Sequence, residues 1–141
     1  MGRGFNFATC LEGALKIKEL SYMHCEGIMS GELKHGPLAM VDENLRICMI
    51  ICKDTVYSKS LNALQQVVAR GGAPIIIADK TVPENKFFVM SSYQFDNFIQ
   101  DLAGMEHVLR VPKTVDCVQN ILTVIPLQLM SYHIAELNGH N

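Results

Sequence analysis

The sequence predicts an α/β protein, a three-layer αβα sandwich of the flavodoxin-like kind with a parallel sheet in the middle layer. Short apolar runs alternate with segments of helical period, the order that produces parallel strands joined by helices. The apolar runs at 45–52, 74–78 and 108–111 show hardly any alternation with polar residues, as in strands buried on both faces. Helical spacing is clearest at about 6–26 and 114–137.

The predicted first helix, at about 6–26, follows a glycine turn at Gly2 and Gly4. Leu11, Leu15 and Tyr22 recur at helical spacing and mark its expected apolar face, and the smaller residues Ala8, Ala14 and Cys25 lie on the same side. In this fold class a strand normally leads into such a turn. The first strand is therefore expected to be missing, which would leave apolar surface uncovered unless a partner supplies it.

The second and last helices have recognisable ends. Residues 53–55 supply a cap for a helix that runs to Arg70 and stops at a pair of glycines. Thr114 is expected to cap the last helix, and Pro126 inside that helix should kink it. Its expected buried face consists of Val118, Ile121, Leu122, Ile125 and Leu129. Between the last two strands, residues 81–107 have no clean period, and a partly helical excursion is expected there.

Composition narrows the class of protein. With 141 residues, 49% of them hydrophobic and 18% charged, the chain is a folded single domain rather than a disordered tail. Its 12 basic and 14 acidic residues provide no basic field, so we expect no nucleic-acid partner. The apolar runs fall short of the roughly 20 residues of a membrane helix. Five cysteines without a paired or metal-binding spacing indicate reduced thiols in the cytoplasm and no metal. The sequence has neither a complete dinucleotide fingerprint nor a Walker-type motif, so we expect no cofactor.

A narrow charged stripe on the first helix is the strongest candidate for chemistry. Glu12, Lys16 and Glu19 fall within a stripe of roughly 60°, with apolar residues on both sides. One interpretation is an ion-pair ladder that satisfies its own charges. The other is the wall of an active site, in which a carboxylate acts as a base and a lysine tunes it.

A second candidate is the segment at 31–37, where glycines bracket a charged tetrapeptide that ends in His35. Histidine titrates near neutral pH, so His35 could transfer a proton. Loops held by a scaffold are where binding residues concentrate, although a solvated turn would have the same composition.

The two segments carry a family resemblance, which continues along the chain. The matching stretches are CLEGALKIKE at 10–19, GELKHGP at 31–37, NALQQVVARGG at 62–72, VPKTVDCVQNILTVIPLQL at 111–129 and SYH at 131–133. They resemble the isomerising glutamine–fructose-6-phosphate aminotransferases, also called glucosamine-6-phosphate synthases. The similarity is to the second of two sugar isomerase (SIS) subdomains. It implies one partial SIS domain over 1–141, with 81–107 as an atypical insertion.

The resemblance also implies a function. These enzymes make glucosamine 6-phosphate from fructose 6-phosphate for hexosamine biosynthesis, and their isomerase half moves a proton between C1 and C2. Glu19 matches the base for that transfer, and Lys16 matches a lysine that stabilises the enolate-like intermediate. Glu12 is then the partner that orients Lys16. His35 matches a histidine that helps to open the sugar ring in the neighbouring subunit's site, which implies a homo-oligomer.

Departures from the family leave alternatives open. The glutaminase domain, the first SIS subdomain with its phosphate-binding loop, and a C-terminal tail with a carbonyl-binding lysine have no counterpart in this sequence. We therefore expect negligible turnover from the isolated chain. The alternatives to an isomerase segment are a non-catalytic module that binds sugar phosphate or regulates, and a fragment that serves only in assembly.

Overall fold

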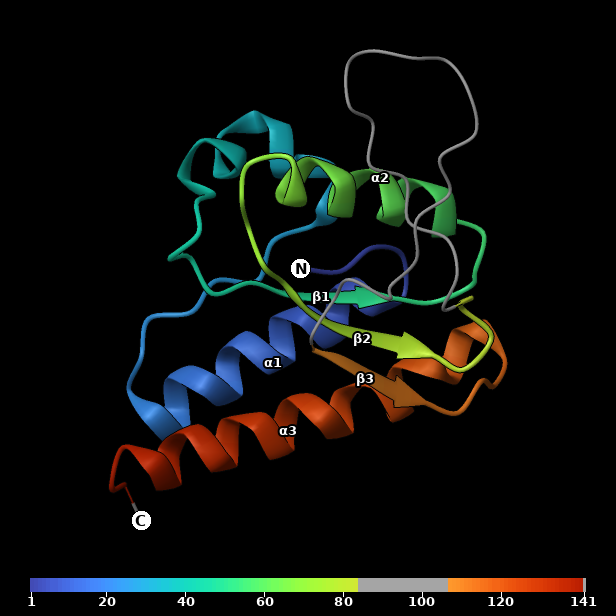
Figure 1. The fold of residues 1–141 in the computed structure, drawn as a ribbon. Coiled ribbons are helices and arrows are strands. Elements are labelled where there is room, and N and C mark those ends of the chain that lie inside the picture. The colour runs from blue at the N-terminus through green and yellow to red at the C-terminus, as the bar shows by residue number, and fades with distance from the viewer. Residues whose placement is uncertain (84–106, 141) are drawn as a thin grey trace.

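The computed structural model of the protein describes residues 1–83 and 107–140. Its sheet has three parallel strands in the order β1–β2–β3 (Figure 1). The strands are β1 (Cys48–Ile51), β2 (Ile75–Asp79) and β3 (Val108–Val111). All three lie within or beside the predicted apolar runs, and the parallel sheet is confirmed.

Helices cover both faces of the sheet. On one face lies α2 (Tyr57–Val68), together with two short 3-10 helices, η1 (Ser30–His35) and η2 (Pro37–Met40) (Figure 1). On the other face lie α1 (Asn6–Ser21) and α3 (Gln119–Leu137), with η4 (Asp116–Val118) leading into α3. The predicted αβα sandwich is confirmed.

The strands divide their side chains between two cores. Met49 and Ile51 of β1 point into the core beneath α2, whereas Ile50 between them points toward α1 and α3. In β2, Ile76 and Ile77 divide in the same way. Because successive strand residues face opposite sides, a strand covered by helices on both faces must be apolar throughout. The sequence runs have that composition.

The prediction that the large apolar residues of α1 are buried is wrong, although Ala14 on the same predicted face is buried. Leu11 is 47% exposed and Tyr22 is 78% exposed. The buried face consists of small and polar residues: Asn6, Thr9, Cys10, Gly13, Ala14 and Ser21. Gly13 contacts α3 so closely that a Cβ there would lie 2.7 Å from Leu127 Cδ1. The helices approach through these small residues, which leaves the larger side chains on the outer surface.

The predicted buried face of the last helix is also wrong, because most of its residues lie on the outer surface. Ile121, Ile125 and Leu129 are exposed. The residues that α3 buries are Gln119, Thr123, Leu127, Ser131 and Ala135. Their four-residue spacing follows one side of a helix, but three of the five are polar, so a search for apolar periodicity overlooks them.

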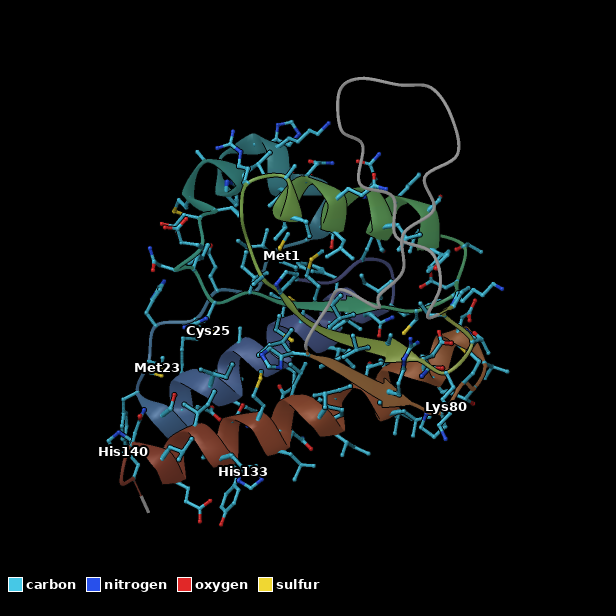
Figure 2. The ribbon with its side chains drawn as sticks, in the orientation of Figure 1. Met1, Met23, Cys25, Lys80, His133 and His140 are labelled. Atoms are coloured by element: carbon cyan, nitrogen blue, oxygen red, sulfur yellow. The ribbon has the colours of Figure 1, made fainter. Side chains whose placement is uncertain are left out.

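Two helix ends also differ from prediction. α1 stops at Ser21 rather than near residue 26 because Tyr22 takes a left-handed conformation, with φ of 56°, and its N–H bonds to Lys18 O. The ring of Tyr22 then packs edge-on against His140, which lies beside the end of α1 (Figure 2). α3 begins at Gln119 rather than at Thr114. The side chain of Gln119 accepts a bond from Thr114 N–H and donates one to Pro112 O, which fastens the connection from β3.

The expected excursion at 81–107 lies, for residues 84–106, outside the described residues. In the described ranges, 1–83 and 107–140, no helix combines the length and hydropathy that a bilayer crossing requires.

Candidate functional site

The charged stripe of α1 forms a continuous ion-pair ladder. Lys16 Nζ lies 2.8 Å from Glu19 Oε2, one turn further along, and 3.7 Å from Glu12 Oε1, one turn back. Helical geometry brings side chains three and four residues apart onto one face, so the contacts follow from the sequence spacing. Two of the three predicted catalytic residues are therefore adjacent, and Glu12 contacts Lys16 from the preceding turn of the helix.

The ladder fixes the charge of its central residue. The hydrogen bond from Lys16 to Glu19, with the attraction between their charges, raises the pKa of Lys16 above its usual value, and Glu12 adds to the effect. Lys16 is consequently cationic throughout the neutral range. It is suited to stabilising negative charge and unsuited to accepting a proton.

The arrangement is compatible with proton transfer. The Glu19 side chain is 48% exposed and the Lys16 side chain 31%, so a ligand can approach both. A carboxylate can accept a proton from a carbon atom and return it to the neighbouring carbon, while a fixed cation stabilises the charge that develops. The same three side chains also make a self-satisfied surface ladder, whose contribution to stability is small.

His35 is displayed on the opposite side of the sheet. It is the exposed last residue of η1, a turn anchored by the buried Leu33 in the core beneath α2. Gly36 follows with φ of 138°, a conformation that favours glycine. Lys16 and Glu19 belong to α1, on the other face. Within one chain, therefore, His35 lies in a different layer from the Lys16–Glu19 pair.

A buried carboxylate at the carboxyl edge of the sheet was not among the predicted site residues. Asp79, at the end of β2, accepts hydrogen bonds from Lys53 N–H at 2.6 Å, from Thr81 N–H at 2.8 Å and from the Thr81 hydroxyl. Burial disfavours the charged form, but these bonds outweigh it, so the pKa of Asp79 is lowered. Arg110 donates to the carbonyl oxygens of Asp79 and Val82. Asp79 thus holds the loops that follow β1 and β2 in place.

The sequence contains a local signal for Asp79, because it directly follows a buried apolar strand. Its donors could not be identified in advance. Lys53 lies 26 residues away in the sequence and uses its backbone. Such edges are where open parallel sheets bind ligands, so a rigid loop there would support a site on neighbouring residues.

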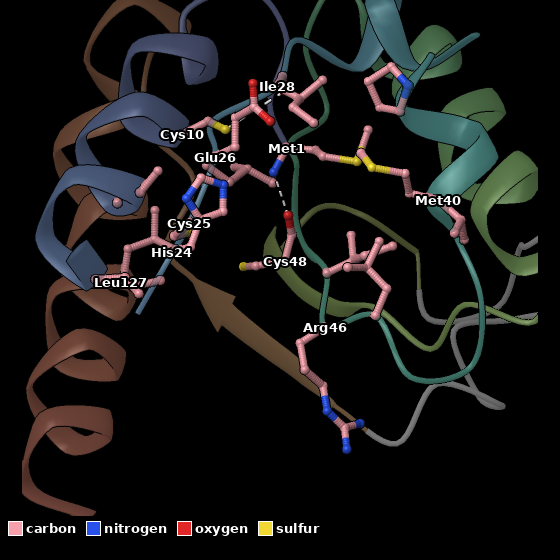
Figure 3. Close-up of a pocket in the computed structure, with 18 of the residues that line it drawn as sticks. Met1, Cys10, His24, Cys25, Glu26, Ile28, Met40, Arg46, Cys48 and Leu127 are labelled. Atoms are coloured by element: carbon pink, nitrogen blue, oxygen red, sulfur yellow. Dashed lines mark hydrogen bonds between the residues drawn. The ribbon is translucent and has the colours of Figure 1, made fainter. Parts of the chain in front are cut away.

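A cavity of about 360 Å³ lies between α1, residues 24–28 and the start of β1 (Figure 3). Cys10, Cys25 and Cys48 line it. Burial raises the pKa of Cys25, and it raises the pKa of Cys48 to about 11, which favours the protonated thiol at both of these residues. Nowhere in residues 1–83 and 107–140 do three or more His, Cys, Asp or Glu side chains gather as a metal site would require.

Comparison with known protein families gives one match: a model of the SIS domain covers residues 1–83. Whole proteins with similar sequences are glutamine–fructose-6-phosphate aminotransferases (isomerising). Form 2 from Mus musculus is 52% identical over all 141 residues, and the protein from Encephalitozoon cuniculi is 50% identical over the same span. This chain spans 18% of the length of each of these relatives.

Solved structures agree with the sequence comparison. The C-terminal domain of glucosamine-fructose-6-phosphate aminotransferase from Francisella tularensis superposes with a TM-score of 0.80 at 43% identity. That match covers 99% of this chain and 35% of the other. A solved structure from Silicibacter pomeroyi, at 22% identity and a TM-score of 0.65, shares the fold.

Proposed function

Because this chain belongs to the SIS-domain family, we propose that it forms part of the isomerase half of a glutamine–fructose-6-phosphate aminotransferase. In that role it would bind fructose 6-phosphate and catalyse the ketose-to-aldose step that gives glucosamine 6-phosphate. The observation that carries this proposal is the Lys16–Glu19 pair, 2.8 Å apart on an accessible face of α1. The relatives at about 50% identity, each named for this activity, support it.

In the proposed mechanism Glu19 is the base. Its carboxylate takes the proton from one of the two reacting carbons and returns it to the other on the same face of the sugar. A single accessible carboxylate suffices for both steps because the two carbons are adjacent. The half-exposed position of Glu19 supports direct contact with the substrate.

Lys16 would stabilise the negative charge that develops on the substrate oxygen when the proton leaves carbon. Its raised pKa supports a permanently cationic role. Glu12, 3.7 Å from the ammonium on the other side, would hold Lys16 in position while Glu19 is engaged with substrate. Glu12 is thus a positioning residue.

We further propose a homo-oligomer in which His35 of one subunit completes the site of another. Two observations support this: His35 lies in a different layer from the Lys16–Glu19 pair, and α3 exposes Ile121, Ile125 and Leu129 along one side. Exposed apolar surface of this kind is typical of contact sites. We also propose that the protein resides in the cytoplasm, because its cysteines are free thiols. Residues 1–141 would form one partial SIS domain with an insertion at 81–107.

A second candidate function is a module that binds sugar phosphate without catalysis. The ion-pair ladder favours this binding function, because the charge of Lys16 is neutralised by two glutamates of its own helix. The two functions differ in one measurable property. A catalytic segment exchanges a carbon-bound proton of fructose 6-phosphate with solvent, whereas a binding module retains affinity without exchange.

The test uses a full-length aminotransferase in which this sequence replaces the matching 18% of the Mus musculus relative. In deuterium oxide, the unmodified hybrid should incorporate deuterium into fructose 6-phosphate, as followed by NMR. Glu19→Gln should abolish incorporation while the affinity for fructose 6-phosphate persists. Glu43→Gln, at an exposed acidic residue outside the stripe, serves as the matched control and should exchange normally. Undiminished exchange in Glu19→Gln would refute the assignment.

A further inference from the structure

Tyr22, the residue that follows α1, has a backbone conformation that is unusual for its residue type. Its φ of 56° and ψ of 14° lie in the left-handed region. Among the non-glycine residues that the structure describes, Tyr22 alone has a positive φ. Glycine usually occupies such a position after a helix, because the Cβ of any other residue crowds the backbone there. Tyrosine at this position therefore lowers stability relative to glycine.

Burial of the side chain offsets little of that loss. Tyr22 is 78% exposed. Within residues 1–83 and 107–140, its hydroxyl has no hydrogen-bond partner. A strained residue whose side chain adds so little to the core is typical of a functional site, where the strain is retained for the sake of the side chain.

The ring of Tyr22 is nevertheless held in place by His140. The two ring centroids are 4.8 Å apart, with the ring planes at 90°. His140 is itself fixed at the end of α3, where its N–H donates to Ala135 O at 2.9 Å. Figure 2 shows His140 at the same end of the helix layer as Met23, the residue after Tyr22. An exposed ring that is already oriented loses little conformational freedom when a ligand binds to it.

Tyr22 also lies beside the proposed base. Its N–H donates to Lys18 O at 3.2 Å, which is the helical hydrogen bond, so the Tyr22 backbone still follows the path of α1. Side chains three residues apart on a helix begin about 5–6 Å from each other, and Glu19 is three residues before Tyr22. A ligand in contact with the Glu19 carboxylate is therefore within reach of a tyrosine ring.

We propose that Tyr22 is a substrate-binding residue of the isomerase site, whose ring packs against the carbon chain of the sugar phosphate while Glu19 contacts the reacting carbons. The carbon chain of a sugar carries C–H groups, which pack well on an aromatic ring. A tyrosine supplies that apolar surface with a polar tip in water. This assignment rests on the proposed function, because Tyr22 and Glu19 would share one substrate.

The test measures the Kd of fructose 6-phosphate by calorimetry in the full-length hybrid. Tyr22→Gly removes the ring and suits the left-handed backbone, so it should raise Kd about fivefold or more. Tyr22→Phe keeps the ring and should change Kd by less than about twofold. Tyr132→Leu is the matched control, because Tyr132 is also an exposed ring in edge-on contact with a histidine, but on α3. It should leave Kd unchanged, and an unchanged Kd in Tyr22→Gly would overturn the proposal.

Thermal unfolding of the 141-residue chain separates a binding role of Tyr22 from a structural one. Tyr22→Gly should leave Tm unchanged or raise it by a few degrees, because relief of the left-handed strain offsets the lost ring contact. A fall in Tm of more than about 4 °C would show that the ring serves the fold, and would also overturn the proposal.

Deuterium exchange in the same hybrid distinguishes this proposal from the proposed function. If the unmodified hybrid exchanges deuterium and Tyr22→Gly binds fructose 6-phosphate as tightly, the role of Tyr22 is refuted and that of Glu19 stands. If the hybrid does not exchange but Tyr22→Gly binds more weakly, the binding role of Tyr22 is supported and the isomerase function is refuted.

Discussion

The hydroxyl of Thr123 donates a hydrogen bond of 2.9 Å to Asn6 Oδ1, and so joins the first helix to the last across 117 residues of sequence. Both side chains are buried, Asn6 at 3% exposed and Thr123 at 0%. The bond lies between α1 and α3, where small side chains bring the two helices close together. It fixes the position of the helix that carries Glu12, Lys16 and Glu19.

We predict that Thr123→Val lowers the free energy of unfolding by about 1–3 kcal/mol, because it leaves Asn6 Oδ1 buried without a donor. Urea denaturation at neutral pH measures the change. Thr55→Val, the same substitution at an exposed position, should alter stability by less than about 0.5 kcal/mol. Equal effects of the two variants would show that the bond contributes little.

This contact illustrates what the sequence could predict and what it could not. The strands were predictable because residues buried on both faces must be continuously apolar, as at 49–51 and 76–78. The contact between α1 and α3 was not, because it depends on Gly13, Thr123 and Ser131, which have no apolar signal. Apolar periodicity indicated Leu11 and Ile125 instead, and both are exposed.

The candidate site was also predictable from the sequence only in part. The spacing of Glu12, Lys16 and Glu19 is local, so it predicted the ladder directly. Asp79 depends on a backbone donor 26 residues away, and the cavity of about 360 Å³ depends on segments brought together only by the fold. Local spacing carries no information about either contact.

Asp79 should make stability depend on pH in the acid range. Its folded-state pKa is lowered, whereas the unfolded chain has the ordinary value of about 3.9. Between these two values the unfolded state binds more protons, so stability falls as the pH drops through that window and is unaffected above about pH 5. The difference in unfolding free energy between wild type and Asp79→Asn should therefore be constant from pH 7 to about pH 5 and shrink below about pH 4.

Urea denaturation at several pH values measures that difference. Asp42→Asn is the matched control, since Asp42 also accepts two backbone hydrogen bonds, from Asn44 and Leu45, but is exposed. At pH 7 it should lower the free energy of unfolding by less than Asp79→Asn does, because its carboxylate is exposed to water. A difference for Asp79→Asn that is as large at pH 3 as at pH 7 would contradict the assignment of the lowered pKa.

The cysteines should differ sharply in reactivity. Burial raises the pKa of Cys48 to about 11 and that of Cys52 to about 12, so neither forms an appreciable amount of thiolate at pH 8. Cys117, in η4, is exposed. Brief treatment of the native protein with iodoacetamide at pH 8 should label Cys117 and spare the other two, as peptide mass spectrometry would show. In urea all three should react, and early labelling of Cys52 in the native protein would contradict the burial seen in the structure.

The placement of His35 in a different layer from Lys16 and Glu19 leads to a test of the shared site. In the full-length hybrid, Glu19→Gln and His35→Ala should each be inactive in isomerisation. If His35 of one subunit completes the site of its partner, a mixed dimer of the two variants contains one site with both residues intact. Random reassembly of equal amounts should then restore about a quarter of wild-type activity. Mixing each variant with itself controls for refolding, and no recovery in the mixture would place His35 in the site of its own chain.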